Sequence, residues 1–371
     1  MTRLAVDVRA LAADNLTGVG VYERDLLQAM LQLDPELELR LWTAGSQAPK
    51  MTHLQPLLQR QQDQTVHFYQ SNRYFNLTTV LGSAGKQLYR QLQADCHFFP
   101  HPNFLPLPVP QPYAVTVHDL SFLHQPSWYD FKGRLWHRAL HLRELLTSAR
   151  AIIAVSESTA EQIQHYFPHI AGSKIRVIPN GLKTQLLTRE QAQTLTASLQ
   201  LPPDFVLSVG TIEPRKNLAS VIAAYQRWRH TQPAVKLVIA GKYGWSVVRS
   251  QLTQREKEGI IWLGFVSDEQ RNALYRLARA FVWPSFYEGF GFPPLEALRQ
   301  GTPVVTSYTS AMPEMLQQYA YYVNPYNYGE LAQIVGQILV QPNRLVVPEA
   351  FFDTFSWHAA AKETLDVLLH V

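Results

Sequence analysis

Two glutamates, Glu288 and Glu296, flank a loop of glycines, aromatics and prolines in the segment YEGFGFPPLEAL. Gly289 and Gly291 allow unusual backbone conformations and a close approach of the backbone to a ligand. The prolines and the residues after them predict a helix start, whose free N–H groups and positive dipole end attract anions. A carboxylate beside an anion site would repel the anion, so its presence is explained if it binds hydroxyl groups of the ligand instead. A ligand with both phosphates and hydroxyls, such as a nucleotide sugar, accounts for both features.

Adjacent cations, Arg215 and Lys216, occur in the segment SVGTIEPRKNL, where a strand is expected to end and a helix to begin. Cations are unfavourable at a helix N-terminus. A bound diphosphate would remove this conflict, because arginine supplies a planar fork of donors and lysine a point charge. The alternative is a solvated charged turn. The glycine loop with its two glutamates in the same half of the chain favours the phosphate site.

A histidine, His118, follows the apolar segment AVTV and precedes Asp119. A histidine at the carboxyl end of a parallel strand is expected to point into a ligand crevice. The alternative is a hydrogen-bonded histidine of the core. The other histidines of this half show no metal-ligand spacing, so no metal site is expected.

Two further glycines, Gly18 and Gly20, occur in the segment TGVG between the first expected strand and helix. The segment lacks the G-x-G-x-x-G fingerprint of dinucleotide-binding proteins. These glycines either allow a phosphate to approach the backbone or only shape a turn.

Apolar strand-like segments alternate with helical patterns twice along the chain, which predicts two doubly wound parallel sheets. Ligands then bind beyond the carboxyl ends of the strands, and a cleft between domains is the expected place. We expect an N-terminal domain over residues 1–182, a donor-binding domain over 183–355 and a last helix over 356–371. Residues 183–200 resemble a linker, and residues 50–75 give no clear pattern. The expected strands are LAVDV, ELRLWTAG, AVTVHDL, AIIAVS, KIRVIPNG, FVLSVG, AVKLVIAG, IIWLGF, FVWPS and TPVVTS.

Residues 131–149 predict one basic amphipathic helix, with Leu135, Ala139, Leu142 and Leu146 along one face. Such a helix either packs its apolar stripe on the core or contacts anionic lipid or a lipid-diphosphate acceptor.

Composition limits the class of protein. The chain has 371 residues, 46% hydrophobic residues and a formal net charge of +4, so two cores are possible and nucleic acid is not required. The single cysteine, Cys96, excludes an internal disulfide and fits a reducing compartment. No apolar run reaches the roughly 20 residues that span a bilayer, and the N-terminus lacks a signal-peptide profile. We expect a cytoplasmic protein whose membrane contact, if any, is peripheral.

Taken together, the segments resemble family 4 of the retaining glycosyltransferases. The resemblance covers nearly the whole chain through TGVGVY, VHDL, AVSEST, IPNG, VGTIEPRKN, VIAG, YEGFGFPPLEAL and GTPVVTS. It implies an α/β protein with the GT-B fold, in which two Rossmann-like domains face each other across a cleft. The segment VHDLSFLHQPSWY, together with GTIEPRKNL, is most similar to bacterial mannosyl- or rhamnosyltransferases of polysaccharide assembly.

The resemblance also implies residue roles. The catalytic residues would be Arg215, Lys216, Glu288 and His118. The donor-binding residues would be Gly18, Gly20, Gly210, Gly289, Phe290, Gly291, Leu295 and Glu296. Two positions depart from the family pattern: Leu182 follows IPNG where aspartate is usual nearby, and Thr211 follows Gly210 where arginine is frequent.

The implied activity is metal-independent transfer of a hexose, with mannose favoured, from GDP-mannose to a glycan or lipid-linked acceptor in synthesis of a bacterial surface polysaccharide such as O-antigen. No cofactor is expected, and the place of action would be the cytoplasm, at the inner face of the plasma membrane if residues 131–149 bind lipid. The alternatives are a nucleotide-sugar epimerase of the same fold and a non-catalytic nucleotide-sugar-binding protein.

Overall fold

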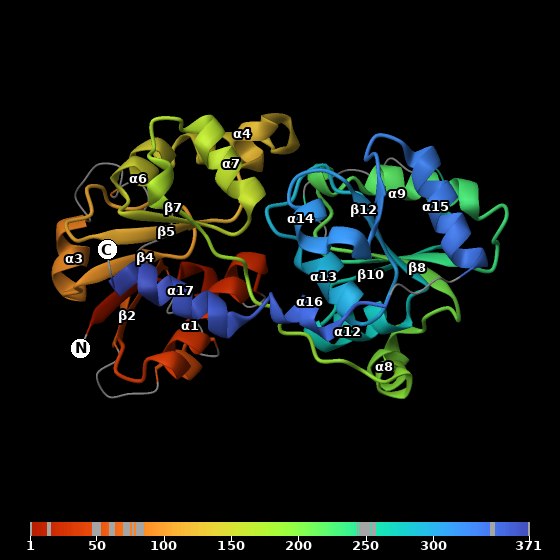
Figure 1. Ribbon diagram of the computed structural model, residues 1–371, viewed down its shortest axis with the longest axis horizontal. Helices are drawn as coiled ribbons and strands as arrows, with labels where there is room; N and C mark the ends of the chain where they lie inside the picture. Colours follow the sequence, from red (N-terminus) through yellow and green to blue (C-terminus); the bar gives the residue numbers. More distant parts are fainter. Residues whose placement is uncertain are drawn as a thin grey trace. The chain divides into compact units, whose positions relative to one another are not determined.

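Two parallel β-sheets organise the chain, each in its own compact unit, as the computed structural model in Figure 1 shows. The first unit comprises Met1–Leu123, Phe131–Gly181 and Phe355–Val371, and the second comprises His124–Asp130 and Leu182–Thr354. The structure describes residues 2–12, 16–46, 53–58, 64–69, 75, 78, 85–242, 244, 253, 257–341 and 346–369.

The first sheet has seven strands in the order β3-β2-β1-β4-β5-β6-β7, and all neighbouring strands pair in parallel. Strands covered on both faces are apolar along their length, as the buried segment YAVTV illustrates. The strands are β1 (Arg3–Asp7), β2 (Glu38–Gly45), β3 (Gln64–Tyr69), β4 (Cys96–Phe99), β5 (Tyr113–Val117), β6 (Ala151–Ala154) and β7 (Ile175–Val177).

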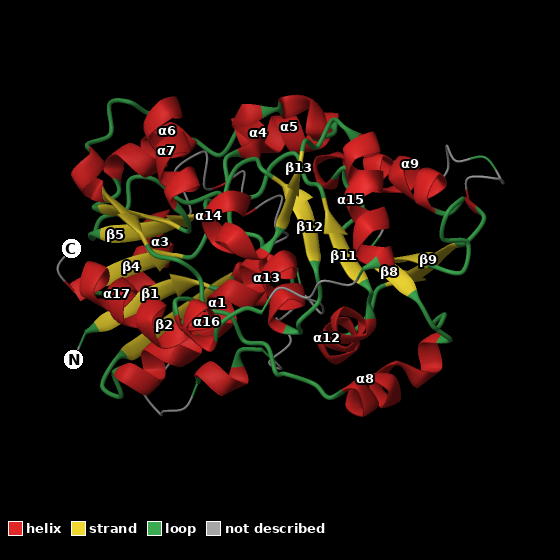
Figure 2. Cartoon of the chain, turned by 45° about the vertical axis from the view of Figure 1, so that its right-hand side comes forward, coloured by secondary structure: helices red, strands yellow, loops and turns green. Residues whose placement is uncertain are grey.

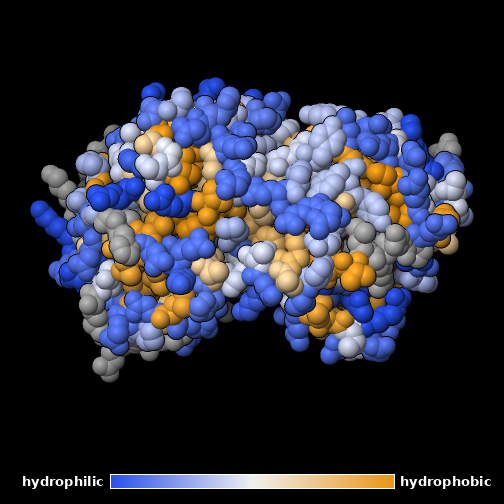
Figure 3. All heavy atoms as spheres, in the orientation of Figure 1, coloured by the Kyte–Doolittle hydropathy of each residue, from blue (hydrophilic) through white to orange (hydrophobic). Residues whose placement is uncertain are grey.

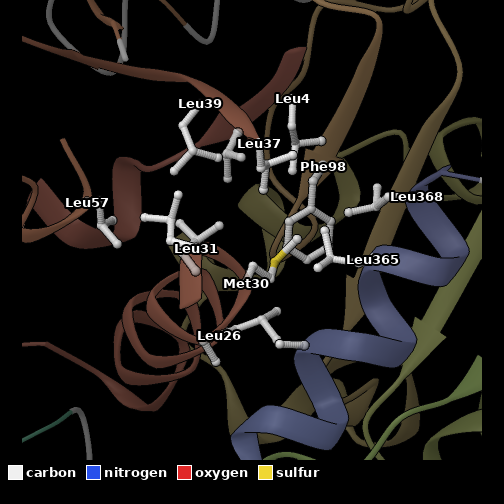
Figure 4. Close-up of a cluster of buried hydrophobic side chains, with 14 of the residues drawn as sticks. Leu4, Leu26, Met30, Leu31, Leu37, Leu39, Leu57, Phe98, Leu365 and Leu368 are labelled. Atoms are coloured by element: carbon white, nitrogen blue, oxygen red, sulfur yellow. The ribbon is translucent and has the colours of Figure 1, made fainter. Parts of the chain in front are cut away.

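Helices cover both faces of the first sheet. Side chains alternate along a strand, so Leu4 and Val6 join one core cluster and Ala5 joins the other. The first cluster includes residues of α1 (Gly18–Leu33) and of the last helix, α17 (Trp357–Leu369), which pack together. Figure 4 shows Leu365 and Leu368 of α17 pointing into this cluster, and full burial of each stabilises the fold by about 1.5–3 kcal/mol. On the other face lie α3 (Gly85–Leu92), α6 (Leu142–Ser148) and α7 (Glu157–Tyr166).

The second sheet has six parallel strands in the order β10-β9-β8-β11-β12-β13. They are β8 (Phe205–Val209), β9 (Lys236–Ala240), β10 (Ile260–Gly264), β11 (Ala280–Trp283), β12 (Val304–Ser307) and β13 (Tyr321–Val323). The two parallel sheets confirm the expected fold class.

Helices also lie on both faces of the second sheet (Figure 2). The helices α9 (Leu218–Trp228) and α15 (Tyr328–Val340) pack together over one core cluster. The helices α12 (Asp268–Leu277) and α13 (Phe292–Arg299) lie on the other face (Figure 1). Two short helices, α14 (Met312–Leu316) and α16 (Glu349–Asp353), also belong to this unit.

The prediction of a single helix over residues 131–149 is wrong. The structure has two helices, α5 (Phe131–Arg138) and α6, separated by a turn in which His141 has φ of 48°. This left-handed conformation ends the helical path. The expected apolar stripe is therefore divided: Leu142 and Leu146 are buried in the core, whereas Leu135 is 59% exposed.

The linker expected over residues 183–200 is also only partly correct. It contains α8 (Arg189–Thr196), which packs on α12. Its start is a capping box in which Thr188 and Gln191 satisfy each other's backbone N–H groups. The helix α7 also has a side-chain cap, because Oγ of Ser156 accepts a hydrogen bond from the Thr159 N–H at 3.0 Å.

Residues 50–75, which gave no pattern, contain β3 and a short turn at residues 55–57; the rest of that range lies largely outside the described residues. Some expected strands are shorter than predicted, since β7 ends at Val177 and β11 at Trp283.

Hydrophilic side chains separate the hydrophobic patches on the face that Figure 3 shows. Within the described ranges, no helix combines the length and the apolar character that crossing a bilayer requires.

Candidate active site

The loop after β8 is fastened to the loop after β11. Gly210 follows β8, and a single turn of 3₁₀ helix at Pro214–Lys216 carries the two cations. Asn217, buried and with φ of 55°, donates from Nδ2 to the carbonyls of Pro284 at 3.0 Å and Pro325 at 2.7 Å. The N–H of Phe286 donates to the Arg215 carbonyl at 2.9 Å. These bonds hold the cationic turn against the carboxyl end of β11.

Both cations hold the same carboxylate. Nη1 of Arg215 donates to Oε2 of Glu288 at 3.0 Å, and Nζ of Lys216 donates to Oε1 at 2.7 Å. A second carboxylate, Glu213, accepts from Nε of Arg215 at 3.1 Å. The Glu288 N–H donates to Oγ of Ser310 at 2.8 Å. The structure thus places Arg215, Lys216 and Glu288 in one buried network, although they come from two separate loops.

Burial and charge act in opposite directions within this network. Burial lowers the pKa of Lys216 and the neighbouring Arg215 lowers it further, while Glu288 partly restores it. Burial by itself would raise the pKa of Glu288, but Lys216 and Arg215 outweigh it and the net pKa is lowered. Lys216 also lies 4.5 Å from the centre of the Trp283 ring, a cation–π contact. Glu288 therefore stays ionised between two cations.

Glycines of the site are required by the protein's own packing. Gly210 has φ of 139°, and a Cβ there would lie 2.7 Å from the Trp283 ring. Gly291 has φ of 95°, and a Cβ there would lie 2.3 Å from Cε of Met312. Both conformations disfavour other residues. Close approach of a ligand is thus not needed to explain either glycine.

The start of α13 offers fewer donors than its sequence suggests. Pro293 and Pro294 lack an N–H, and the Leu295 N–H donates to the Gly291 carbonyl at 3.4 Å. The Leu295 side chain is fully buried, so it is unavailable to a ligand. The loop before α13 contains Gly289, Phe290 and Gly291. Phe290 is itself buried, with its ring 5.0 Å from that of Phe292.

The second glutamate of the motif, Glu296, is held by an arginine that the sequence did not single out. Nε of Arg271 donates to Oε2 of Glu296 at 3.0 Å, and Nη2 donates to Oε1 at 3.2 Å. The bidentate pair fixes the carboxylate plane. Because a carboxylate accepts about four hydrogen bonds, capacity for ligand hydroxyls remains.

The other expected site residues belong to the first unit. His118 directly follows β5, and Nε2 donates to the Pro100 carbonyl at 2.8 Å. Burial lowers its pKa. Gly18 and Gly20 lie in the first turn of α1 and not in a loop. A Cβ on Gly20 would contact the Ala10 carbonyl at 3.1 Å, whereas Gly18 faces open space.

The sequence did not predict the role of several residues at this site. No local pattern marks Asn217 or Ser310, because their hydrogen-bond partners lie far away in the chain. Arg271 follows a readable capping box at Ser267, yet its pairing with Glu296 depends on the crossing of α12 and α13. Across the described ranges, no three or more His, Cys, Asp or Glu side chains lie where they could hold a metal ion.

Two family models match the chain in succession. The model described as "Glycosyltransferase Family 4" matches residues 16–186, and the model described as "Glycosyl transferases group 1" matches residues 195–347. The first covers His118 and the second covers the charged network.

The proteins that are similar in sequence or in structure include glycosyltransferases. The chain is 29% identical over 366 residues to O-antigen chain mannosyltransferase B of Escherichia coli, covering 95% of each. Among solved structures, sucrose-phosphate synthase from Thermosynechococcus elongatus matches 99% of this chain and 98% of its own, with a TM-score of 0.72 and 18% identity. The Anabaena protein HepE, solved with UDP and glucose, matches 99% and 96%, with a TM-score of 0.68 and 17% identity. At these identities the two structures establish a shared fold.

Proposed function

The chain belongs to family 4 of the glycosyltransferases and has the GT-B fold, and from this premise we propose that it transfers a hexose from a nucleoside-diphosphate sugar to a glycan or lipid-linked oligosaccharide. The observation that carries the proposal is the pair of partly buried cations, Arg215 and Lys216, which share the carboxylate of Glu288 at 3.0 and 2.7 Å. Such a pair is suited to a diphosphate, and the adjacent carboxylate to sugar hydroxyls.

Negative charge develops on the diphosphate as the bond from the sugar C1 to the phosphate oxygen breaks. Arg215 and Lys216, fixed in advance by Asn217 and the β11 loop, stabilise this charge without reorganising. Glu296, oriented by Arg271, would accept hydrogen bonds from the ribose hydroxyls.

We propose that the anomeric configuration is retained by attack on the same face from which the diphosphate leaves. Glu288 is a poor nucleophile, because both of its oxygens are engaged by cations. The acceptor oxygen then forms the new bond to C1, and its proton passes to the departing phosphate oxygen. No metal or cofactor takes part in this scheme.

GDP-mannose is the proposed donor, and a growing bacterial surface polysaccharide the proposed acceptor. The support is the similarity, over 95% of both chains, to a protein named as an O-antigen chain mannosyltransferase. A panel of GDP, UDP and dTDP in thermal unfolding experiments tests the base, since a ligand that binds only the folded state raises stability. GDP is expected to give the largest shift; a larger shift with UDP or dTDP would overturn the choice of donor.

Transfer itself is tested by incubating GDP-mannose with a mannose-containing oligosaccharide in the presence of EDTA. An α- or β-linkage matching that of the donor is expected in the product by NMR. An epimer formed from the donor alone would favour an epimerase, and binding without any turnover would favour a non-catalytic protein.

We also propose that α5 contacts an anionic membrane. Phe131, Leu135 and Trp136 are exposed on it, by 72%, 59% and 38%, and the basic side chains Lys132, Arg134 and Arg138 are exposed beside them. Exposed apolar and basic side chains on one short helix suit an anionic lipid surface. Co-sedimentation with vesicles containing phosphatidylglycerol is expected to fall in a Phe131→Ser/Leu135→Ser variant. Val340→Ser, at a similarly exposed position in the second unit, is the control; equal losses, or no binding by wild type, would refute the contact.

A further inference from the structure

His118 is held from two sides, by the Pro100 carbonyl and by the Tyr22 ring. On one side its Nε2 lies 2.8 Å from the Pro100 carbonyl. On the other, its ring meets the ring of Tyr22 edge to face, with centroids 4.7 Å apart and an interplanar angle of 84°. These contacts come from the residue that follows β4 and from α1, so they converge on the carboxyl end of β5 from separate elements.

The contact with Pro100 determines which nitrogen carries the proton. A carbonyl oxygen only accepts, so Nε2 must be the protonated nitrogen. Burial lowers the pKa of His118, although Asp119 and the Pro100 carbonyl oppose this. A neutral ring with a proton on Nε2 has a lone pair on Nδ1. In the described part of the chain, the structure shows no hydrogen-bond partner for that atom.

Tyr22 is itself fixed, and this makes it a rigid support. Its side chain is 2% exposed, and its hydroxyl is hydrogen-bonded to Oγ1 of Thr116 at 2.9 Å. Thr116 is fully buried in β5, one residue from the end of that strand. Trp357, at the start of α17, packs on the Tyr22 ring with centroids 5.9 Å apart. The Tyr22 ring therefore cannot move away from His118 without breaking a buried hydrogen bond.

We propose that Tyr22 is a positioning residue that, with the Pro100 carbonyl, holds His118 as the Nε2–H tautomer and presents Nδ1 as a hydrogen-bond acceptor for a substrate hydroxyl. The proposal rests on the proposed function and narrows it, because a nitrogen without a proton cannot donate to phosphate. His118 would recognise a hydroxyl of the transferred sugar or of the acceptor. The titratable groups near His118 are Asp119, next in the chain, His101, which follows β4, and Tyr22 itself.

The tautomer can be observed without any substrate. Long-range ¹H–¹⁵N correlation spectra of protein labelled on histidine, with His118→Gln for assignment, report the protonation of each ring nitrogen. Near neutral pH, His118 is expected to show a protonated Nε2 and an unprotonated Nδ1. The reverse pattern, or two protonated nitrogens, would overturn the proposal even if the protein transfers sugar.

The role of Tyr22 is tested by Tyr22→Leu, which removes the ring, and by Thr116→Val, which leaves the ring but removes its hydrogen-bond partner. Tyr22→Leu is expected to lower turnover roughly tenfold or more, because misplacement of a positioned group strongly reduces rate, and to make the His118 spectrum a mixture of tautomers. Thr116→Val should act in the same direction and more weakly, and it keeps the test decisive if Tyr22→Leu does not fold.

Tyr225→Phe is the matched control, since Tyr225 is also 2% exposed and its hydroxyl donates to the Gly259 carbonyl at 3.0 Å in the second unit. It is expected to lower thermal stability but to leave turnover and the His118 spectrum unchanged. Unchanged spectra and turnover in folded Tyr22→Leu would refute the positioning role while leaving the transferase assignment intact. Absence of transfer by wild type, with the expected tautomer, would refute the transferase and the substrate role of His118.

Discussion

Two buried glutamates, one in each unit, show how differently the two interiors treat charge. Glu288 is 6% exposed at the carboxyl end of the second sheet, and Glu23 is fully buried on α1 of the first unit. Burial raises the pKa of both. At Glu288, Lys216 and Arg215 reverse this effect and the net pKa is lowered. At Glu23, Asp7 raises the pKa further and Arg9 only partly opposes it.

The pKa values of the two glutamates differ because the nearby cations donate to Glu288 but not to Glu23. Arg215 and Lys216 both donate to Glu288. Arg9 instead donates to both oxygens of Asp7, at 2.6–3.1 Å, and neither oxygen of Glu23 has a hydrogen-bond partner among the described residues. In the second unit two cations therefore lower the pKa of the buried carboxylate, whereas in the first unit burial and Asp7 raise the pKa of Glu23 and favour its neutral form.

The largest effect is expected for Glu288→Ala. It leaves two partly buried cations without their shared anion, and removing one partner of a buried ion pair destabilises a protein by up to about 3–5 kcal/mol. Inorganic pyrophosphate should then restore part of the loss, by about 2.7 kcal/mol at a hundred times its dissociation constant. Urea unfolding with and without pyrophosphate measures both effects.

Glu258→Ala is the control for that experiment, because the Glu258 side chain is exposed and forms an ion pair with Arg229; it should change stability by no more than about 1 kcal/mol. Stability of Glu288→Ala equal to that of wild type, or no response to pyrophosphate, would contradict the account of the network.

Lys216→Ala comes next. Loss of one fixed donor to developing negative charge is expected to lower kcat by about 10²–10³. Steady-state transfer from the donor measures this, with Lys236→Ala as the control, since Lys236 is in the same unit and donates to the Pro233 carbonyl in an exposed site. Near-normal turnover of Lys216→Ala would show that the cation does not stabilise the leaving group.

The two glutamates predict opposite pH dependences. Glu288, with its pKa lowered, contributes stability above its unfolded pKa of about 4.3, and this is lost as pH falls through the folded pKa. Glu23, with its pKa raised, contributes stability below that value, and this is lost as pH rises toward its folded pKa.

Glu23→Gln isolates the second effect, because glutamine stays neutral. Relative to wild type, the variant is expected to gain about 1.4 kcal/mol for each pH unit between the unfolded and folded pKa of Glu23. Urea unfolding at a series of pH values measures the difference. A constant difference at every pH would mean that the pKa of Glu23 is the same in the folded and unfolded states, which would contradict the effect of burial.

The smallest effect is expected for Arg271→Lys. Lysine keeps the charge but cannot form the bidentate pair that orients Glu296. The donor KM is expected to rise about tenfold, equivalent to about 1.4 kcal/mol, while kcat changes little. Arg229→Lys, at the surface pair with Glu258, should alter neither constant. A fall in kcat with unchanged KM would move Glu296 from donor binding to the chemical step.

Local patterns in the sequence predicted the strands of the second unit and several residues of its charged network. The apolar strands that end before Arg215 and Glu288 were visible because strands covered on both faces are apolar throughout. The adjacent cations and the glycines were visible because they conflict with ordinary helix starts and turns. The broken helix at His141 and the helix α8 were missed, since the first depends on packing of Leu142 and Leu146 and the second on a capping box within a polar segment.

Contacts between distant segments could not be predicted. Asn217, Arg271 and Tyr22 act on partners that are brought close only by the crossing of helices and strands. Glu23 reads as an ordinary polar position of an amphipathic helix, and only the structure shows that it is fully buried.

The most direct test of the central claim is a crystal structure with GDP bound. The diphosphate is expected within hydrogen-bonding distance of Nζ of Lys216 and the guanidinium of Arg215, and the ribose hydroxyls at Glu296. GDP bound elsewhere, with Arg215 and Lys216 still paired to Glu288 and out of reach of both phosphates, would contradict the claim.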